Sequence, residues 1–275
     1  MTDIMTRLNE HYNYLKNKGY DICCLMLQGS QNYGLDEYTE SYQSDVDSKA
    51  IVIPSFRDFV YDIPPVSKTE VLPNGEHIDV KDIRIMFEMF KKSNISYIEL
   101  LFTSYKIINP KYYKNISLIF KNRQDIAEIN YNQFLKCIGG MARNKAKALC
   151  HPYPTVIDKI EKYGYDGKQL SHLVRLYEFI NRYVHGTPIE ECYWTEDKEM
   201  LMNFKKQLTP NGDRVLKGDE AITAAFFYLD AIETIVDWYL LPHCESDKKT
   251  IEMLDNIKYN ILQQKFKEDL NYARN

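Results

Sequence analysis

Residues 22–35 read ICCLMLQGSQNYGL, and SDVD follows at residues 44–47. The apolar run at residues 22–27 is short and continuous, as expected for a buried strand. Gly29, directly after it, lets the backbone turn and approach a ligand closely. Ser30 adds a hydroxyl and a backbone N–H, and such a turn often opens a helix whose N-terminus favours phosphate. The stretch therefore predicts a strand followed by a phosphate-binding turn.

Two aspartates follow this turn at the start of the next expected strand, over residues 46–53. Asp45 and Asp47 flank Val46, and strand alternation points both carboxylates to one face. Carboxylates this close repel each other unless a cation lies between them. Mg²⁺ suits the pair, because it prefers oxygen ligands and takes the rest of its shell from water and phosphate. The pair therefore predicts a magnesium site beside the Gly-Ser turn.

A third carboxylate is expected from the strand at residues 77–80, which alternates polar and apolar residues. Asp79 and Asp82 both lie near the required place. We choose Asp79, because it lies inside the strand on the polar face shared with His77. Asp82 is better explained as the N-cap of the following helix. With the first two carboxylates, Asp79 would complete a catalytic two-metal site for phosphoryl transfer.

The composition limits what such a site can serve. The chain has 275 residues, 44% hydrophobic and 27% charged, which is ordinary for one large or two small globular domains. Its net charge of −4 counts against holding nucleic acid by bulk charge, so such contact needs a local basic patch. No run approaches the roughly 20 apolar residues of a membrane-spanning helix. The six cysteines lack C-x-x-C spacing, which favours reduced thiols in a cytoplasmic protein.

The chain changes character near residue 109. Strand-like and helix-like runs alternate before it, and Ser96 with Glu99 is typical of a capping box that opens a short helix. Helical patterns dominate after it. They predict helices at residues 130–149, 167–185, 196–207, 218–241 and 247–269. We therefore expect a catalytic domain at residues 1–108 and an all-helical domain at 109–275, which closes over nucleotide and acceptor.

One of these helices has two opposite stripes. Asp166 is a plausible N-cap, and the helix that follows carries an apolar stripe on one side. The opposite side is basic, with Lys168, His172, Arg175 and Arg182. Such a helix could cover a triphosphate while it packs on its own domain. A solvated basic face is the alternative.

A second basic run lies in the helix at residues 130–149. Arg143, Lys145 and Lys147, with Lys136, could follow a polynucleotide backbone and bind an acceptor. A solvated helix face is again the alternative. Among the many tyrosines, Tyr33 inside the Gly-Ser motif is the candidate for stacking on a base.

The pattern of strand, Gly-Ser turn, Asp-x-Asp and strand resembles the DNA polymerase β-type nucleotidyltransferase superfamily. More narrowly, GSQNYGL resembles the opening motif of the RlaP-like (RNA-repair-associated) predicted nucleotidyltransferases. The segments at residues 83–102 and 164–176 resemble two further blocks of that family, so the resemblance runs from about residue 20 to 190, most of the chain. The spacing between Ser30 and Asp45 is longer than usual, which predicts an extra loop at residues 36–44.

This resemblance implies an α+β fold in which a polymerase β-like core, a small mixed sheet with helices, precedes the helical domain. It implies transfer of a nucleoside monophosphate from an NTP to a hydroxyl acceptor, such as an RNA end, with release of pyrophosphate. The implied cofactors are two Mg²⁺ ions, with Mn²⁺ as an alternative. The implied nucleotide-binding residues are Gly29, Ser30, Tyr33, Lys168, His172 and Arg175.

Two alternatives stay open at this point. The acceptor could be a protein hydroxyl, as in nucleotidyltransferase toxins and antitoxins, or a small molecule. The chain could also be a non-catalytic nucleotide or RNA sensor. No residue identifies the NTP, and nothing indicates the oligomeric state.

Overall fold

The computed structural model describes residues 3–37 and 44–272. The chain divides into two compact units. The first, here called the sheet unit, comprises the residues up to 32, residues 36–130 and the residues from 245 onward. The second, here called the helical unit, comprises residues 33–35 and 131–244. Each unit is described by itself below.

The sheet unit is built on one five-stranded mixed sheet, in the order β3-β4-β2-β1-β5. β2 and β4 are parallel, and the other neighbouring strands are antiparallel. The strands are β1 (Ile22–Gln28), β2 (Asp47–Val52), β3 (Ser67–Val71), β4 (His77–Asp82) and β5 (Lys106–Ile108). A small mixed sheet in an α+β fold is therefore confirmed. The edge strands β3 and β5 were not predicted, because β3 is mostly polar and exposed and β5 is only three residues long.

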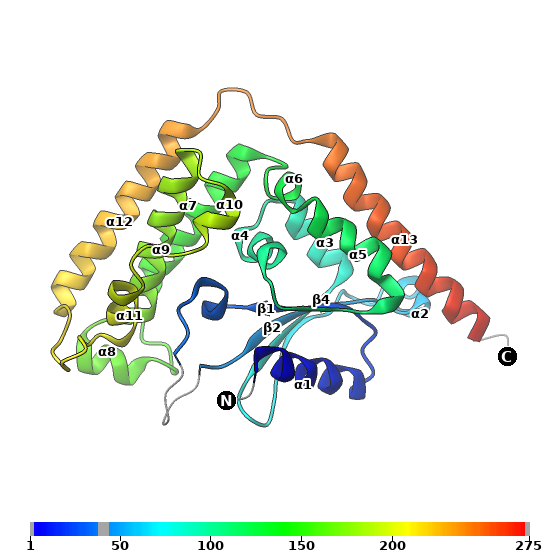
Figure 1. Cartoon of the computed structure of the whole chain (residues 1–275), viewed down its shortest axis with the longest axis horizontal. Helices are drawn as coiled ribbons and strands as arrows, with labels where there is room; N and C mark the ends of the chain where they lie inside the picture. Colours follow the sequence, from blue (N-terminus) through cyan, green and yellow to red (C-terminus); the bar gives the residue numbers. More distant parts are fainter. Residues whose placement is uncertain (1–2, 38–43, 273–275) are drawn as a thin grey trace. The chain divides into compact units, whose positions relative to one another are not determined.

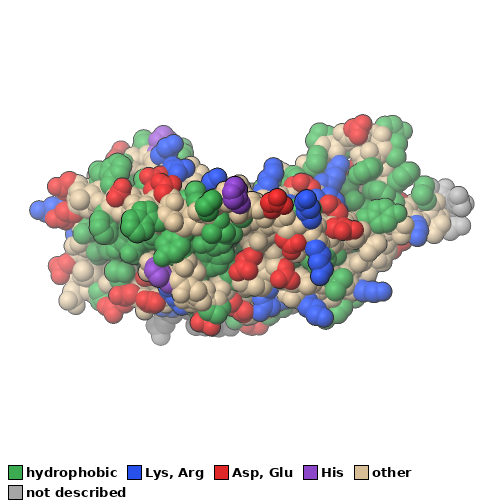
Figure 2. All heavy atoms as spheres, turned by 90° about the horizontal axis from the view of Figure 1, so that it is seen from above, with side chains coloured by type: hydrophobic (Ala, Val, Ile, Leu, Met, Phe, Trp, Pro, Cys, Tyr) green, Lys and Arg blue, Asp and Glu red, His purple; other side chains and the backbone are tan. Residues whose placement is uncertain are grey.

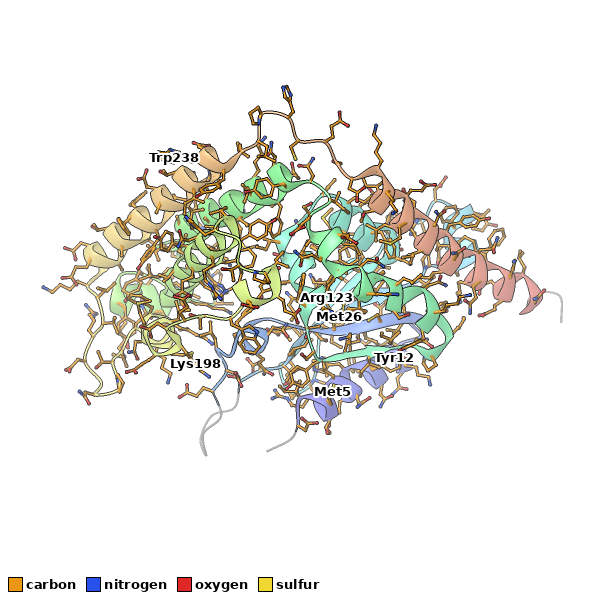
Figure 3. The ribbon with its side chains drawn as sticks, turned by 45° about the horizontal axis from the view of Figure 1, so that its top comes forward. Met5, Tyr12, Met26, Arg123, Lys198 and Trp238 are labelled. Atoms are coloured by element: carbon orange, nitrogen blue, oxygen red, sulfur yellow. The ribbon has the colours of Figure 1, made fainter. Side chains whose placement is uncertain are left out.

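A helix packs on each face of the sheet. One face is apolar and packs on α1 (Ile4–Asn17), where Leu8 and Leu15 join side chains such as Leu25 and Val80 in a buried core. α3 (Ile83–Lys91) packs on β2 and β4. Figure 1 shows α1 on one side of the sheet and α3 on the other. Met26, labelled in Figure 3, is a buried residue of the interior strand β1.

Further helices complete the sheet unit. They are α2 (Phe56–Val60), α4 (Ile95–Ile98), α5 (Tyr113–Lys121), α6 (Arg123–Ala127), α13 (Lys248–Tyr272) and the 3-10 turns η1 (Ser30–Tyr33), η2 (Glu99–Phe102) and η3 (Pro110–Tyr112). The last residue of η1 is grouped with the helical unit. α13 packs on α2, α3, α5 and α6. The ring of Phe266 lies 5.5 Å from that of Phe56 and 5.4 Å from that of Phe59.

These contacts divide the chain differently from the predicted domains at residues 1–108 and 109–275. Residues 109–130 and α13 belong to the sheet unit. The periodicity of α13 does identify a helix, but it does not identify the partner on which the helix packs. Contacts such as that between the Lys91 ammonium and Asp255, at 2.6 Å, join residues far apart in the sequence.

The helical unit is centred on α9. Its helices are α7 (Tyr131–Ala148), α8 (Ile157–Tyr163), α9 (Gly167–Val184), α10 (Ile189–Cys192), α11 (Lys198–Lys206) and α12 (Gly218–Tyr239). α9 packs on α7, α10, α11 and α12. A Cβ at Gly167 would collide with the carbonyl oxygen of Phe204, so the close approach of α9 and α11 requires glycine here. The helices predicted over this unit are found within two residues at each end.

The helix caps test three sequence predictions. Asp82 and Asp166 cap α3 and α9, because each carboxylate accepts a backbone N–H of the first turn. The predicted capping box of Ser96 and Glu99 is wrong. α4 begins one residue before Ser96, and the side chain of Asn94 accepts the Ser96 N–H at 3.1 Å. Glu99 instead begins η2.

The surface of the helical unit exposes several large apolar side chains. Phe226, Phe227 and Trp238 of α12 are all more than half exposed, and Figure 3 labels Trp238 on that helix. On the left of Figure 2, hydrophobic side chains lie among carboxylates. Within residues 3–37 and 44–272, no helix is long and apolar enough to cross a membrane.

Candidate functional site

The Gly-Ser turn lies against one of the predicted metal ligands. Gly29 follows β1 with φ of 94°, a left-handed conformation that favours glycine. A Cβ at Gly29 would lie 3.7 Å from Asp47 Oδ2. Asn32 closes the turn, because its Nδ2 donates to the Leu27 carbonyl at 2.9 Å while its Oδ1 accepts the Thr103 hydroxyl at 2.7 Å. The turn and the aspartate are thus held side by side in the sheet unit.

Asp45 and Asp47 differ in their surroundings. Asp45 is exposed and precedes β2, whereas Asp47 begins the strand and pairs in register with Gln28. Asp47 Oδ1 is buried and accepts no hydrogen bond from the residues that the structure describes. A buried carboxylate oxygen without a hydrogen bond is a group that a hard cation would satisfy. Asp47 therefore fits the predicted Mg²⁺ site, and the exposed Asp45 stays a predicted ligand.

Asp79 does not complete that site as predicted. It shares a face with Asp47 but pairs in register with Lys49, and it accepts hydrogen bonds from Lys49 Nζ at 2.6 Å and Lys81 Nζ at 2.9 Å. Burial raises the pKa of Asp79, but the two lysines outweigh burial and hold that pKa below its usual value. Within the described ranges, no three His, Cys, Asp or Glu side chains are grouped to hold a metal.

The β4 side chain nearest to Asp47 is His77, not Asp79. His77 Nδ1 lies 3.4 Å from Asp47 Oδ1, and the parallel register places Asp79 two residues further along the strand. Sequence reasoning also missed Lys49, which is only 3% exposed and whose Nζ lies 4.2 Å from the centre of the Tyr97 ring. A lysine inside an otherwise apolar strand was the available signal, because such a charge needs a buried partner.

Gln31 is a second residue that sequence reasoning missed. It lies in η1, one residue after Ser30, and is 7% exposed. Its Nε2 donates to the carbonyl oxygen of Asp45 at 2.8 Å and to that of Ser44 at 3.4 Å. Gln31 therefore ties the Gly-Ser turn to the backbone of the Asp-x-Asp segment. Nothing in the spacing alone indicates this bridge.

Tyr33 and Arg175 meet inside the helical unit. The Arg175 guanidinium carbon lies 3.8 Å from the centre of the Tyr33 ring, which also stacks on Tyr193 at 6.3 Å. Arg175 is 7% exposed, and its Nε has no hydrogen-bond partner among the described residues. No carboxylate in the described part of the chain forms an ion pair with it. A buried guanidinium in this state is suited to an anion.

His172 lies among further cations. Burial lowers the pKa of His172 well below its usual value, and so do Lys145, Arg175, Lys168 and Lys205, in that order. The imidazole is therefore neutral near pH 7. The three predicted binding residues of α9, Lys168, His172 and Arg175, thus lie near one another and near lysines of α7 and α11. Of the three, Lys168 is exposed.

Other members of the basic stripes serve the fold. Arg182 donates to the Trp194 carbonyl oxygen at 2.7 Å. Arg143 pairs with Glu233 of α12 at 2.5 Å, whereas Lys145 lies close enough to His172 to affect its pKa. Because residues two apart on a helix point about 200° apart, Lys145 cannot share a face with Arg143. Lys136, Arg143 and Lys147 recur seven and four residues apart and do share one exposed face of α7, so the predicted acceptor track stays a prediction for these three.

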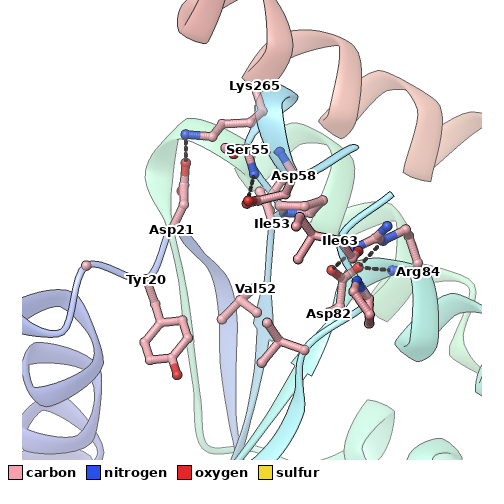
Figure 4. Close-up of a pocket in the computed structure, with 14 residues that line it drawn as sticks. Tyr20, Asp21, Val52, Ile53, Ser55, Asp58, Ile63, Asp82, Arg84 and Lys265 are labelled. Atoms are coloured by element: carbon pink, nitrogen blue, oxygen red, sulfur yellow. Dashed lines mark hydrogen bonds and ion pairs between the residues drawn. The ribbon is translucent and has the colours of Figure 1, made fainter. Parts of the chain in front are cut away.

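A separate pocket of about 290 Å³ lies at the other end of β2 (Figure 4). Its charges are already paired, with Arg84 on Asp82 at 2.8 Å and Lys265 on Asp21 at 3.0 Å. It contains none of the predicted site residues. It does contain Asp82, the rejected alternative to Asp79, which the helix cap of α3 accounts for.

Comparisons with known proteins add little to this geometry. No protein-family model and no curated protein matches the chain. The chain is similar to a solved structure described as a nucleotidyltransferase-like protein from Exiguobacterium sibiricum 255-15, at 9% identity and a TM-score of 0.28. The similarity covers 84% of this chain and 74% of that one.

Proposed function

We propose that the chain is a Mg²⁺-dependent nucleotidyltransferase that moves a nucleoside monophosphate from an NTP to a hydroxyl acceptor and releases pyrophosphate. The observation that supports this most is the Asp47 carboxylate against Gly29, with one buried oxygen that lacks a hydrogen bond among the described residues. The Gly-Ser turn offers backbone N–H and hydroxyl donors for phosphate. The proposed metal ligand Asp47 is thus a neighbour of the proposed phosphate-binding turn.

Asp45 and Asp47 are the proposed metal ligands, for two Mg²⁺ ions or for Mn²⁺. Bound there, the metal would screen the triphosphate and lower the pKa of the acceptor hydroxyl. As a third ligand, Asp79 would have to exchange its hydrogen bonds from Lys49 and Lys81 for the metal. His77 Nδ1 lies 3.4 Å from Asp47 Oδ1.

In the helical unit, Arg175, His172 and Lys168 are the proposed phosphate-binding residues. Arg175 carries a permanent charge without an acidic partner among the described residues, so a phosphate oxygen would supply the missing counter-charge. His172 is neutral near pH 7 and can donate one N–H to a phosphate oxygen. Tyr33 already stacks on Arg175 and would position that guanidinium rather than a base.

The test is incubation with each α-³²P-NTP and Mg²⁺, first with total RNA and separately with a protein lysate. Label in RNA supports an RNA-end acceptor, and label in protein indicates protein nucleotidylation. Asp45→Ala/Asp47→Ala should abolish the labelling, whereas Glu70→Ala, which removes a different carboxylate of the sheet unit, should not. Equal labelling by wild type and Asp45→Ala/Asp47→Ala would refute the assignment. NTP binding without any labelled acceptor would favour a sensor.

A further inference from the structure

The backbone segment that carries Asp45 and Asp47 is held by hydrogen bonds on its buried side. Val46, between the two aspartates, is fully buried, and its N–H donates to Glu76 Oε1 at 2.9 Å. Glu76 is 1% exposed and lies just before β4. A carboxylate beneath the Asp-x-Asp segment therefore holds its central peptide group.

Two residues of α1 extend this grip. Arg7 forms an ion pair with Glu76, and its Nη1 donates to the Ser44 carbonyl at 2.9 Å. His11 is fully buried and lies between Glu76 Oε2, 2.9 Å from its Nε2, and Ser48 Oγ, 2.8 Å from its Nδ1. Since a carboxylate can only accept, Nε2 donates to Glu76 and Nδ1 accepts the Ser48 hydroxyl.

These contacts cover the segment from both ends and the middle. Ser44, Val46 and Ser48 are each bound by Arg7, Glu76 or His11, the three residues that we call the clamp. The side chains between them, those of Asp45 and Asp47, are not bound by Arg7, Glu76 or His11. Buried, fully bonded polar groups of this kind fix geometry, because each loses a partner if the backbone shifts.

We infer that the clamp is a positioning device for the proposed metal ligands, with Glu76 as its central residue. This inference rests on the proposed function of Asp45 and Asp47. Groups that orient metal ligands through the backbone or through hydrogen bonds typically change metal affinity 10- to 100-fold when removed. A purely structural role for Glu76 would change stability but leave the metal affinity of the folded protein unchanged.

The experiment measures Mn²⁺ binding to the full chain by electron paramagnetic resonance, together with amide exchange at Val46 by NMR. Glu76→Ala removes the acceptor of the Val46 N–H, and Glu76→Gln restores an oxygen at the same place. The matched control is Glu70→Ala. Glu70 is 8% exposed and bonded to Lys18, Lys68 and Tyr20, but it makes no contact with residues 44–48 in the described structure.

We expect Glu76→Ala to weaken Mn²⁺ binding about tenfold or more and to speed exchange at Val46. Glu76→Gln should recover part of both, and Glu70→Ala should leave both near wild type. Wild-type Mn²⁺ affinity in a folded Glu76→Ala protein would overturn the inference. An equal loss in Glu70→Ala would also overturn it, because the effect would then follow from general destabilisation.

Two further outcomes are separable. If Glu76→Ala does not fold, Arg7→Met is used instead. It removes the hydrogen bond to the Ser44 carbonyl, and Arg7 lies nearer the surface than Glu76. Mn²⁺ binding and amide exchange at Val46 then test the inference in the same way. If wild type binds no Mn²⁺, or binds it equally after Asp45→Ala/Asp47→Ala, the proposed function fails together with the premise of the clamp. A different pattern refutes the clamp alone. In that pattern wild type binds Mn²⁺, the binding depends on Asp45 and Asp47, and Glu76→Ala leaves it unchanged.

Discussion

Two buried cations, one in each unit, have opposite surroundings. Lys49 is 3% exposed and bonds the Asp79 carboxylate while it lies over the ring of Tyr97. Arg175 is 7% exposed and lies over the ring of Tyr33, but no carboxylate of the described residues neutralises it. Both cations lie over an aromatic ring, but among the described residues Lys49 is paired with a carboxylate and Arg175 is not.

The difference separates a structural charge from a binding charge. Removal of a cation from water is costly, and a buried partner offsets that cost. Lys49 has such a partner inside the sheet unit and needs no ligand. Arg175 lacks one among the described residues, so its positive charge is available to an anion. Three measurements test whether Lys49 is a structural cation and Arg175 a ligand-binding one.

The largest effect is expected from Asp79→Ala. It leaves Lys49 buried without its carboxylate, and loss of one partner of a buried pair costs about 3 kcal/mol or more. The free energy of unfolding, measured by urea denaturation, should fall by that amount. Lys49→Met/Asp79→Leu should recover much of it, because neither charge is then buried alone. A loss below about 1 kcal/mol in Asp79→Ala would show that the Lys49 charge is stabilised by other means.

A smaller effect on stability is expected from histidine titration beside Arg175. The folded pKa of His172 lies below its ordinary value of 6.5, so the folded state favours neutral imidazole. Its contribution is complete above pH 6.5 and is lost as the pH falls below 6.5, by at most about 1.4 kcal/mol per pH unit. His172→Gln should reduce this dependence of the urea-derived stability on pH between pH 7 and 5.5. An unchanged profile would contradict the placement of His172 among Lys145, Lys168, Arg175 and Lys205.

The smallest change in stability is expected from Arg175→Met. The variant loses the contact with Tyr33, worth about 1 kcal/mol, but also removes an unpaired buried charge, so the two effects largely cancel. Its affinity for inorganic pyrophosphate, measured by calorimetry, should nevertheless fall at least about tenfold. Lys147→Ala, at an exposed position of α7, is the control and should bind pyrophosphate like wild type. A large loss of stability with unchanged affinity would make Arg175 a structural cation like Lys49.

Local signals explain what the sequence could predict. The turn at Gly29 and the caps at Asp82 and Asp166 depend on near neighbours, and the structure contains them. Asp45 lies before β2, so its shared face with Asp47 stays a prediction. The surroundings of Asp79 depend on the register between β2 and β4. A shift of two residues would place Asp79 beside Asp47 and leave Lys49 without its partner. The spacing of residues within one strand does not determine how that strand aligns with its neighbour.

Contacts across long sequence distances account for the rest. Tyr33 follows the Gly-Ser motif, yet it packs with Arg175 and Tyr193 of the helical unit. Glu76 lies in a turn that reads as an ordinary polar loop, yet it is almost fully buried beneath Val46. Each depends on a tertiary contact, which periodicity and spacing cannot indicate.

The membership of α13 in the sheet unit has a consequence for synthesis. A chain made from its N-terminus exposes the surfaces of α2, α3 and α5 before residues 248–272 exist. The helical unit at residues 131–244 is complete by then, so it can fold while Phe56 and Phe59 still await Phe266. The unit that begins first is therefore finished last, and a chain that ends before residue 248 leaves the surfaces of α2, α3 and α5 uncovered.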